Sequence, residues 1–201
     1  MPPGLEPADL HAEPAVQVQT WLDAARAAGV VEPTAMTLAT ADAAGRPSVR
    51  AVLLKGLDAQ GAVFYTNYGS AKARDLDENP HAALALVWPA LHRQVRIAGA
   101  VTRTSAEESD AYFASRAPGS RLGAIASPQS EVIADRAVLE RRIAEAAARH
   151  PDGLPRPPHW GGYRVALDRV ELWQGRPDRL HDRLRYVSAP GDGWRIERLA
   201  P

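Results

Sequence analysis

The sequence predicts an α+β fold built on an antiparallel barrel with flanking helices. Short apolar runs separated by turn residues follow one another along the chain, helical periodicity is confined to segments before and between those runs, and no regular βαβ alternation is present. At 201 residues, with 45% hydrophobic and 24% charged residues, the chain has the composition of one globular domain. We expect that domain over residues 15–201, preceded by a mobile proline-rich arm over residues 1–14.

The first helix is predicted directly after the arm. Val18, Trp21, Leu22 and Ala25 recur at the spacing of one helical face, and Gly29 is placed to end the helix. This helix should therefore cover part of the sheet with its apolar face.

An antiparallel meander is predicted next. Apolar runs at residues 35–41, 48–57 and 62–67 read as strands, because the turn-forming segments 42–45 and 58–61 separate them. Further strands are expected at residues 82–88, 94–104, 163–175, 184–187 and 194–199.

Three more helices have start or stop signals. A helix over residues 70–79 ends before Pro80, and the Ser105-Ala-Glu-Glu108 capping box opens one that runs to about residue 116. Asp135 can cap another that runs to about residue 150. Helices gathered between runs of strands complete the α+β prediction.

The composition excludes several classes of function. A net charge of zero gives no long-range attraction to nucleic acid or to an anionic membrane, and the absence of cysteine excludes thiolate chemistry. The six histidines lack ligand spacing, so no metal site is expected. No phosphate-binding P-loop, dinucleotide fingerprint or Gly-x-Ser-x-Gly element is present. Without a secretory signal pattern or a membrane-length apolar stretch, we expect a cytoplasmic protein.

The two lysines mark the first candidate site. Lys55 and Lys72 are the only lysines among 24 lysine and arginine residues, which suggests that an ammonium group is needed there, although two surface lysines could persist by chance. Residues 65–72 run from a strand end through a glycine turn into a helix start. Thr66, Ser70 and Lys72 could bind a phosphate there, and an ordinary capped helix is the alternative.

Arg50 and Lys55 flank an apolar strand, and a regular strand would place them on opposite faces. They could serve one ligand only if it spanned the strand or if a bulge turned one of them. A core strand with charged ends is the simpler explanation, because the pair alone is a weak signal.

Tyr112 and Arg116 lie four apart on a helix face, with Ser120 just beyond it. The three could bind a second phosphate or form a solvated helix face.

The densest polar segment is 173–183. Arg179, His181 and Arg183 alternate at period two, so an extended segment would project all three to one side and Asp182 to the other. A bound anion or a solvated strand end could explain the pattern.

Taken in order, these segments resemble the pyridoxamine (pyridoxine) 5′-phosphate oxidase family over about residues 34–201. The resemblance rests on Arg50–Lys55, Phe64–Asn67, Gly69–Lys72, Arg93–Val95, Tyr112 with Arg116, Pro128–Ser130, Trp160–Gly162, Trp173–Arg183 and Arg198–Pro201. It implies a single FMN-binding split β-barrel oxidase domain that works as a homodimer, with FMN at the subunit interface.

The resemblance also implies roles for individual residues. FMN would be bound by Arg50, Val52, Leu53, Lys55, Tyr65, Thr66, Ser70, Lys72, Gln94, Gln129, Ser130, Trp173 and Arg183, some of them from the partner subunit. The substrate phosphate would be held by Lys55, Tyr112, Arg116 and Ser120, and the catalytic residues Arg179 and His181 would bind the substrate over its pyridine ring.

The implied reaction oxidises pyridoxamine or pyridoxine 5′-phosphate to pyridoxal 5′-phosphate. Hydride passes from the C4′ carbon of the substrate to flavin N5, and O₂ reoxidises the flavin to give H₂O₂. Two alternatives stay open: a flavin oxidase of secondary metabolism, of the phenazine-pathway type, and a non-catalytic flavin- or vitamer-binding module.

Two features depart from the family pattern. Ala71 stands where the family usually has a phosphate-binding arginine, and Arg74, three residues on, could reach back to replace it. The arm before Pro14 is short and lacks an element that helps to cover the substrate in some members.

Overall fold

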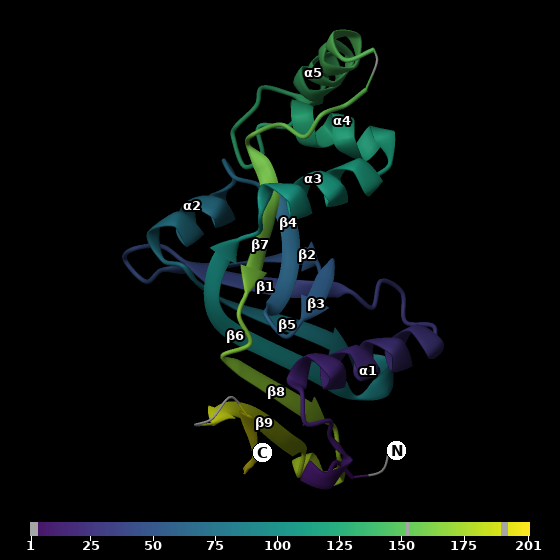
Figure 1. Ribbon diagram of the computed structural model, residues 1–201, viewed down its shortest axis with the longest axis vertical. Helices are drawn as coiled ribbons and strands as arrows, with labels where there is room; N and C mark the ends of the chain where they lie inside the picture. The colour runs from purple at the N-terminus through teal and green to yellow at the C-terminus, as the bar shows by residue number, and fades with distance from the viewer. Residues whose placement is uncertain (1–3, 152, 190–192) are drawn as a thin grey trace.

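The computed structural model describes residues 4–151, 153–189 and 193–201, and these residues form one curled antiparallel sheet with helices around it (Figure 1). The strands are β1 (Ala35–Ala41), β2 (Pro47–Leu53), β3 (Gly56–Asp58), β4 (Gly61–Asn67), β5 (His81–Trp88), β6 (Arg93–Arg103), β7 (Trp160–Val165), β8 (Arg169–Gln174), β9 (Asp182–Ala189) and β10 (Gly193–Leu199). The helices are α1 (Pro14–Ala27), α2 (Ala71–Glu78), α3 (Ala106–Ser115), α4 (Pro118–Ala126) and α5 (Arg136–Arg149), with short 3₁₀ turns at Pro7–Asp9, Pro89–Leu91 and Pro177–Arg179.

The sheet curls at β6. The main strand order is β10-β9-β8-β6-β5-β1-β2, while β3, β4 and β7 form a branch in which β7 pairs with both β4 and β6. Early residues of β6 pair with β8, and Val101–Arg103 pair with β7. At Gly99 a side chain would lie 2.2 Å from the carbonyl oxygen of Ala166, so only glycine permits this close crossing. The expected antiparallel barrel is thereby confirmed in a split form.

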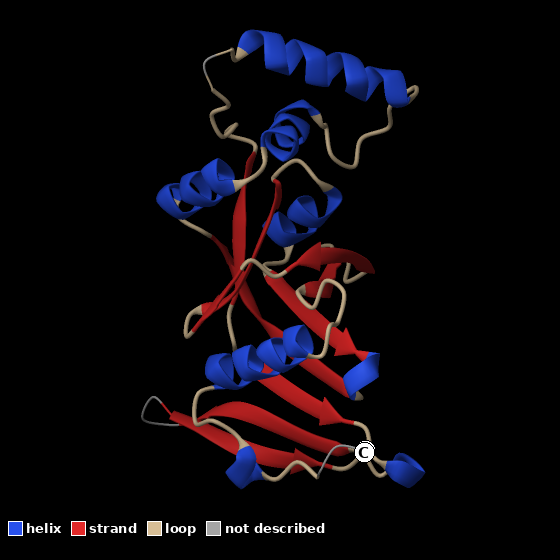
Figure 2. Ribbon diagram, turned by 90° about the vertical axis from the view of Figure 1, so that its right-hand side faces the viewer, coloured by secondary structure: helices blue, strands red, loops and turns tan. Residues whose placement is uncertain are grey.

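The elements separate along the long axis of the molecule. Helices α3, α4 and α5 gather at one end, whereas β9, β10 and both chain termini lie at the other (Figures 1 and 2). Helix α1 lies against the sheet with its apolar residues Val18, Trp21, Leu22 and Ala25 at most 3% exposed, as the periodicity predicts. Burying each large apolar side chain stabilises the fold by about 1.5–3 kcal/mol.

Two predicted strands are each divided in the structure. The run 48–57 breaks at Leu54 and Lys55, because the backbone changes partner there: Leu54 N donates to Thr34 and Lys55 N donates to Val63. The run 163–175 breaks after Val165, where the chain passes from β7 to β8. The apolar pattern continues through both breaks, so it could not reveal that the strands change neighbours.

Helix α4 was missed by the sequence analysis. Pro118 occupies its first turn, a placement that proline favours, and this was the available start signal. The helix is short and has only Ala126 fully buried, so it lacks a clear apolar face. None of the described helices has the length and apolar character needed to cross a membrane.

The N-terminal arm was expected to be mobile, but residues 4–13 pack against the C-terminal strands. Leu5 is 7% exposed, and its backbone N–H donates to Asp182 while its carbonyl accepts from Arg198. The hydroxyl of Tyr186 donates to the carbonyl of His11 over 2.6 Å. These partners lie more than 170 residues away in the sequence, so local composition could not indicate them. Residues 1–3 lie outside the described residues.

Gly161 fixes the packing of β7 and supplies a stability test. A Cβ at this position would lie 2.0 Å from Oη of Tyr68 and 3.0 Å from Oγ of Ser109. We expect Gly161→Ala to lower the free energy of unfolding by about 1–3 kcal/mol, because overpacking forces the neighbours apart. Chemical denaturation measures this change, with Gly119→Ala as the control, since no atom lies within 4 Å of the added methyl in α4. Equal stability of the two variants would contradict the packing argument.

Candidate active site

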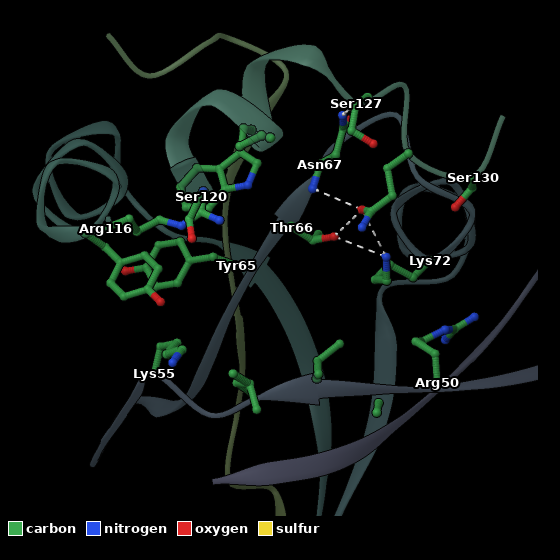
Figure 3. A pocket seen from close by; sticks show the side chains of 18 of the residues that line it. Arg50, Lys55, Tyr65, Thr66, Asn67, Lys72, Arg116, Ser120, Ser127 and Ser130 are labelled. Carbon is green, nitrogen blue, oxygen red and sulfur yellow. Dashed lines mark hydrogen bonds between the residues drawn. The ribbon is translucent and has the colours of Figure 1, made fainter. Parts of the chain in front are cut away.

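A cavity of about 970 Å³ lies among β2, β4, α2, α3 and α4 (Figure 3), at the upper end of the ~300–1,000 Å³ that ligand sites commonly have. Four cations line it, namely Arg50, Lys55, Lys72 and Arg116. None of the described lining residues is an aspartate or a glutamate. In a chain without net charge, this local excess of positive charge makes the cavity suited to an anion.

Lys72 is the centre of the first cationic group. Its side chain is buried, and Nζ donates to Oγ1 of Thr66 at 3.1 Å and to Oε1 of Gln129 at 3.3 Å (Figure 3). Nζ also donates to Oγ of Ser70 at 3.2 Å. All three acceptors are neutral. A buried ammonium with only neutral partners is costly, and an anionic ligand would compensate it.

The turn between β4 and α2 places this lysine. Oδ1 of Asn67 accepts the N–H of Gly69 at 2.7 Å, which closes the turn, and Nδ2 of Asn67 donates to the carbonyl of Ser127 beyond α4. Ser70 occupies the N-cap of α2, but its hydroxyl accepts from Lys72 and does not cap the helix. The predicted succession of strand, turn and helix is therefore present, and Ser70 is buried within it.

The electrostatics of Lys72 match this geometry. Burial is the main cause that lowers the pKa of Lys72 to about 8, and the neighbouring Arg50 lowers it further, whereas Asp75 raises it. Lys72 therefore loses its proton at a lower pH than an exposed lysine does. Binding of an anion would favour the charged form.

Arg50 lies beside Lys72 in Figure 3, on β2. Its guanidinium donates to Oγ1 of Thr40 at 2.6 Å and to Oγ of Ser48 at 2.7 Å, and it lies 3.5 Å from a carboxylate oxygen of Asp75. The apolar residues that follow, Ala51–Leu53, continue the cavity wall. A phosphate beside an apolar strand is the kind of ligand that this part of the cavity could accept.

The second cationic group is Lys55 with Arg116, on the opposite side of the cavity in Figure 3. The guanidinium of Arg116 lies 4.7 Å from the ring centroid of Trp160, and burial lowers its pKa. Its buried Nη1 has no hydrogen-bond partner among the described residues. Such an unpaired donor is rare in a folded protein, and a ligand atom could satisfy it.

Aromatic rings complete this side of the cavity. Tyr65 and Tyr112 stack with centroids 4.0 Å apart, and Tyr65 also stacks with Trp160 at 5.5 Å. Ser120 on α4 lines the same wall. The predicted Tyr112–Arg116–Ser120 cluster is brought together. Trp160 was missed as a stacking residue, because its contacts with Arg116 and Tyr65 join β7 to elements distant in sequence.

Five of the residues that the resemblance assigns to the site do not line this cavity: Gln94, Trp173, Arg179, His181 and Arg183. They belong to β6, β8 and the segment before and within β9, toward the other end of the molecule (Figure 1). The remaining assigned residues line the cavity, apart from the buried Ser70.

The prediction that residues 179–183 form one extended segment was wrong. Asp178 and Arg179 have φ values of 57° and 61°, so a tight turn interrupts the alternation. The ring of His181 lies 4.6 Å from that of Trp173, and its Nδ1 accepts the N–H of Arg176, which leaves Nε2 as the protonated nitrogen of the neutral ring. Period-two geometry therefore does not describe this segment.

Acids accompany the cations of this segment. Arg183 forms an ion pair with the buried Glu171, which also pairs with Arg96. Asp182 pairs with Arg198 and Arg176. The expected repulsion between like charges is thus offset by carboxylates within the chain.

The sequence suggests that Arg74 could take the place of the arginine that is absent at position 71, and the geometry supports part of this idea. Ala71 lines the cavity. Arg74 does reach back toward the start of α2, but its Nη1 donates to the carbonyl of Gly69 at 2.6 Å, and the residue does not line the cavity. In this arrangement the Arg74 guanidinium binds the backbone of the turn and does not face a ligand in the cavity.

Comparison with solved structures defines the class of protein. PhzG from Burkholderia lata 383, solved in complex with tetrahydrophenazine-1-carboxylic acid, matches with a TM-score of 0.91 and 36% identity, covering 98% of both chains. A pyridoxamine 5′-phosphate oxidase-related, FMN-binding protein from Nostoc punctiforme shares the fold, with a TM-score of 0.76, 21% identity and coverage of 99% and 100%. The chain thus has the split-barrel fold of these proteins.

Sequence comparison then gives the family. Residues 22–150 match the family described as pyridoxamine 5′-phosphate oxidase, and residues 160–201 match the pyridoxine 5′-phosphate oxidase C-terminal dimerisation region. Pyridoxine/pyridoxamine 5′-phosphate oxidases from Paraburkholderia phymatum and Burkholderia thailandensis are each 56% identical, over 197 and 199 residues, covering 98% of this chain and 93% of theirs. The chain belongs to the pyridoxamine 5′-phosphate oxidase family.

Proposed function

We propose that this protein is an FMN-dependent enzyme that oxidises pyridoxamine 5′-phosphate or pyridoxine 5′-phosphate to pyridoxal 5′-phosphate. The observation that carries the proposal is the pair of cationic groups in a cavity whose described lining has no acid, because cofactor and substrate each bring one phosphate. The 56% identical relatives bear this activity in their names. A cytoplasmic location, expected from the sequence, is part of the proposal.

The residues present fit FMN. Lys72 is a buried cation whose hydrogen-bond partners are all neutral. It lies at the start of α2, beside Arg50 of β2, and two cations near a helix start suit a phosphate. Thr66 and Gln129 would add hydrogen bonds, with Tyr65 and Ser130 at the cavity wall. When bound, FMN would supply the redox chemistry, a two-electron oxidation of the substrate at its C4′ carbon with O₂ as the final electron acceptor.

The other residues of the chain bind and orient. The strand Arg50–Leu53 would lie along the flavin ring, while Lys55, Tyr112, Arg116 and Ser120 would hold the substrate phosphate. Fixing that phosphate places the reacting carbon at one position and so lowers the entropic cost of reaching the transition state. No nucleophile is needed in this scheme.

A homodimer would complete the site. Trp173, Arg179, His181, Arg183 and Gln94 lie away from the cavity of their own chain, and the C-terminal region matches a dimerisation region. We infer that one subunit supplies these residues to the cavity of its partner, with Arg179 and His181 over the pyridine ring. A mass measurement in solution should give two chains. A stable, active, flavin-loaded monomer would remove the shared site.

The direct test of function uses purified protein with its cofactor. The protein should be yellow, and under anaerobic conditions pyridoxamine 5′-phosphate should bleach that colour by reducing the flavin. Pyridoxamine without phosphate is the matched control and should react far more slowly, because both cations of the second group would lack their partner. Failure of the phosphorylated compound to bleach the flavin would sink the proposal.

The likeness to PhzG favours one second candidate, a flavin oxidase that accepts unphosphorylated aromatic compounds. Arg116, with its unpaired buried nitrogen, and Lys55 argue for a phosphorylated substrate instead. Bleaching by a dihydro-aromatic acid, with no response to pyridoxamine 5′-phosphate, would select the second candidate.

The affinity for FMN should depend on pH through Lys72. Its pKa of about 8 in the flavin-free protein must rise when a phosphate binds, so binding takes up a proton above that pH. Affinity should therefore be flat just below pH 8 and fall above it, by up to about tenfold per pH unit. Titrations from pH 7 to about 10 test this, with Lys72→Arg as a control that keeps its charge throughout. Equal pH dependence in both proteins would contradict the assignment.

A further inference from the structure

A carboxylate and a hydroxyl stand behind the first cationic group without lining the cavity. Asp75 lies on α2 one turn beyond Lys72, and Thr40 lies near the end of β1. Thr40 is 4% exposed, and its hydroxyl donates to the carboxylate of Asp75. This bond joins the helix to the strand directly beneath Arg50.

The single proton of the Thr40 hydroxyl decides the direction of the network. Because that proton is donated to Asp75, the oxygen is an acceptor toward Arg50, whose Nη1 donates to it at 2.6 Å. The Asp75 carboxylate also lies 3.5 Å from Nη2 of Arg50. Ser48, which faces Thr40 across the β1–β2 register, accepts further hydrogen bonds from the guanidinium through its hydroxyl and its carbonyl, and the carbonyl of Leu38 accepts another.

These contacts restrict Arg50 before any ligand arrives. A free arginine side chain must lose rotamer freedom when it grips an anion, and a side chain already held loses less. Arg50 nevertheless lines the cavity, so the restraint leaves it at the wall that an anion would meet.

We propose that Thr40 and Asp75 are positioning residues, which hold the Arg50 guanidinium at the phosphate end of the cavity and so strengthen cofactor binding. This inference rests on the proposed function, because it takes the anion beside Arg50 to be the phosphate of FMN. Neither residue touches the ligand in this scheme. Both act through Arg50.

Asp75 has a second effect, on the charge of Lys72. Arg50 from β2 lowers the pKa of Lys72 and Asp75 from the same helix raises it, while Thr66 and Gln129 offer only neutral oxygens. Asp75 thus supports the charged form of the lysine. If Asp75 acted only through its negative charge, it would repel the phosphate and weaken FMN binding. The direction in which Asp75→Asn changes FMN affinity therefore distinguishes this repulsion from the positioning role.

The experiment measures FMN affinity of the flavin-stripped full chain by quenching of flavin fluorescence. Thr40→Val removes the hydroxyl and keeps the shape of the side chain, whereas Thr40→Ser keeps the hydroxyl. We expect Thr40→Val and Asp75→Asn each to weaken FMN binding roughly fivefold or more, and Thr40→Ser to bind nearly as the native protein does. Asp75→Asn should also shift the alkaline fall in affinity to lower pH, which a merely structural role would not do.

Two matched controls come from the same elements. Thr37→Val changes an exposed residue of β1, and Asp77→Asn changes an acid of α2 that pairs with Arg103 outside the cavity. Both should leave FMN affinity unchanged. Thermal unfolding of each variant shows whether the fold is retained.

The outcomes separate this inference from the proposed function. If the native protein binds no FMN, the proposed function fails. If it binds FMN but Thr40→Val and Asp75→Asn bind equally well, the positioning role alone is wrong. Tighter binding by Asp75→Asn would show that Asp75 is a competing counter-ion and would also overturn the inference.

Discussion

Replacing Lys72 by glutamine should weaken FMN binding by roughly ten- to a hundredfold, the equivalent of one charge-assisted contact of about 1.5–3 kcal/mol. The lysine is 8% exposed and its three protein partners are neutral oxygens, so Lys72 and the neighbouring Arg50 are the charges that this part of the cavity offers a phosphate. Flavin fluorescence measures the dissociation constant. The same change should leave the flavin-free protein as stable as before or more stable, since it removes a buried cation without a carboxylate partner.

Lys55→Gln is the matched control, because Lys55 is the only other lysine and lies in the second cationic group. It should alter substrate kinetics more than flavin retention. If Lys72→Gln kept native FMN affinity, the phosphate would have to lie elsewhere, and the anion-site interpretation of residues 65–72 would be withdrawn.

The second large effect is expected at Arg116. Arg116→Gln should raise KM for pyridoxamine 5′-phosphate by roughly ten- to a hundredfold, because it removes a charged donor whose buried Nη1 has no partner within the described chain. Flavin affinity should change little. Steady-state kinetics at saturating FMN give the result.

Arg103→Gln serves as the control for the loss of an arginine above an aromatic ring. Arg103 lies 4.2 Å from the ring of Tyr68 and pairs with Asp77, and it does not line the cavity. It should leave KM unchanged. Native KM in Arg116→Gln would falsify the substrate-phosphate role of the second cationic group.

Elements whose signals are local could be predicted from the sequence. The apolar face of α1 follows from helical periodicity, and the Ser105–Glu108 capping box opens α3 as expected. Asp135 caps α5 by accepting the N–H of Val138. The contact of Lys72 with Thr66 and Ser70 was also predictable, because one strand, one turn and one helix start carry all three residues.

The meeting of segments that are distant in sequence could be seen only in the folded chain. Gln129 reaches Lys72 from beyond α4, and Trp160 comes from β7 to lie under Arg116. The chain also changes partner strands at Leu54 and after Val165, although its apolar pattern continues there.

The turn before His181 and the packing of residues 4–13 on the C-terminal strands likewise could not be predicted from the sequence. Alternation in the sequence could not show that Arg179 adopts a positive φ, nor that Asp182 binds the backbone of Leu5. Periodicity, caps and turns depend on neighbours within a few residues, so a sequence pattern expresses them directly. Contacts across the sheet depend on strand order and curvature, which arise only when the whole chain buries its apolar surface together.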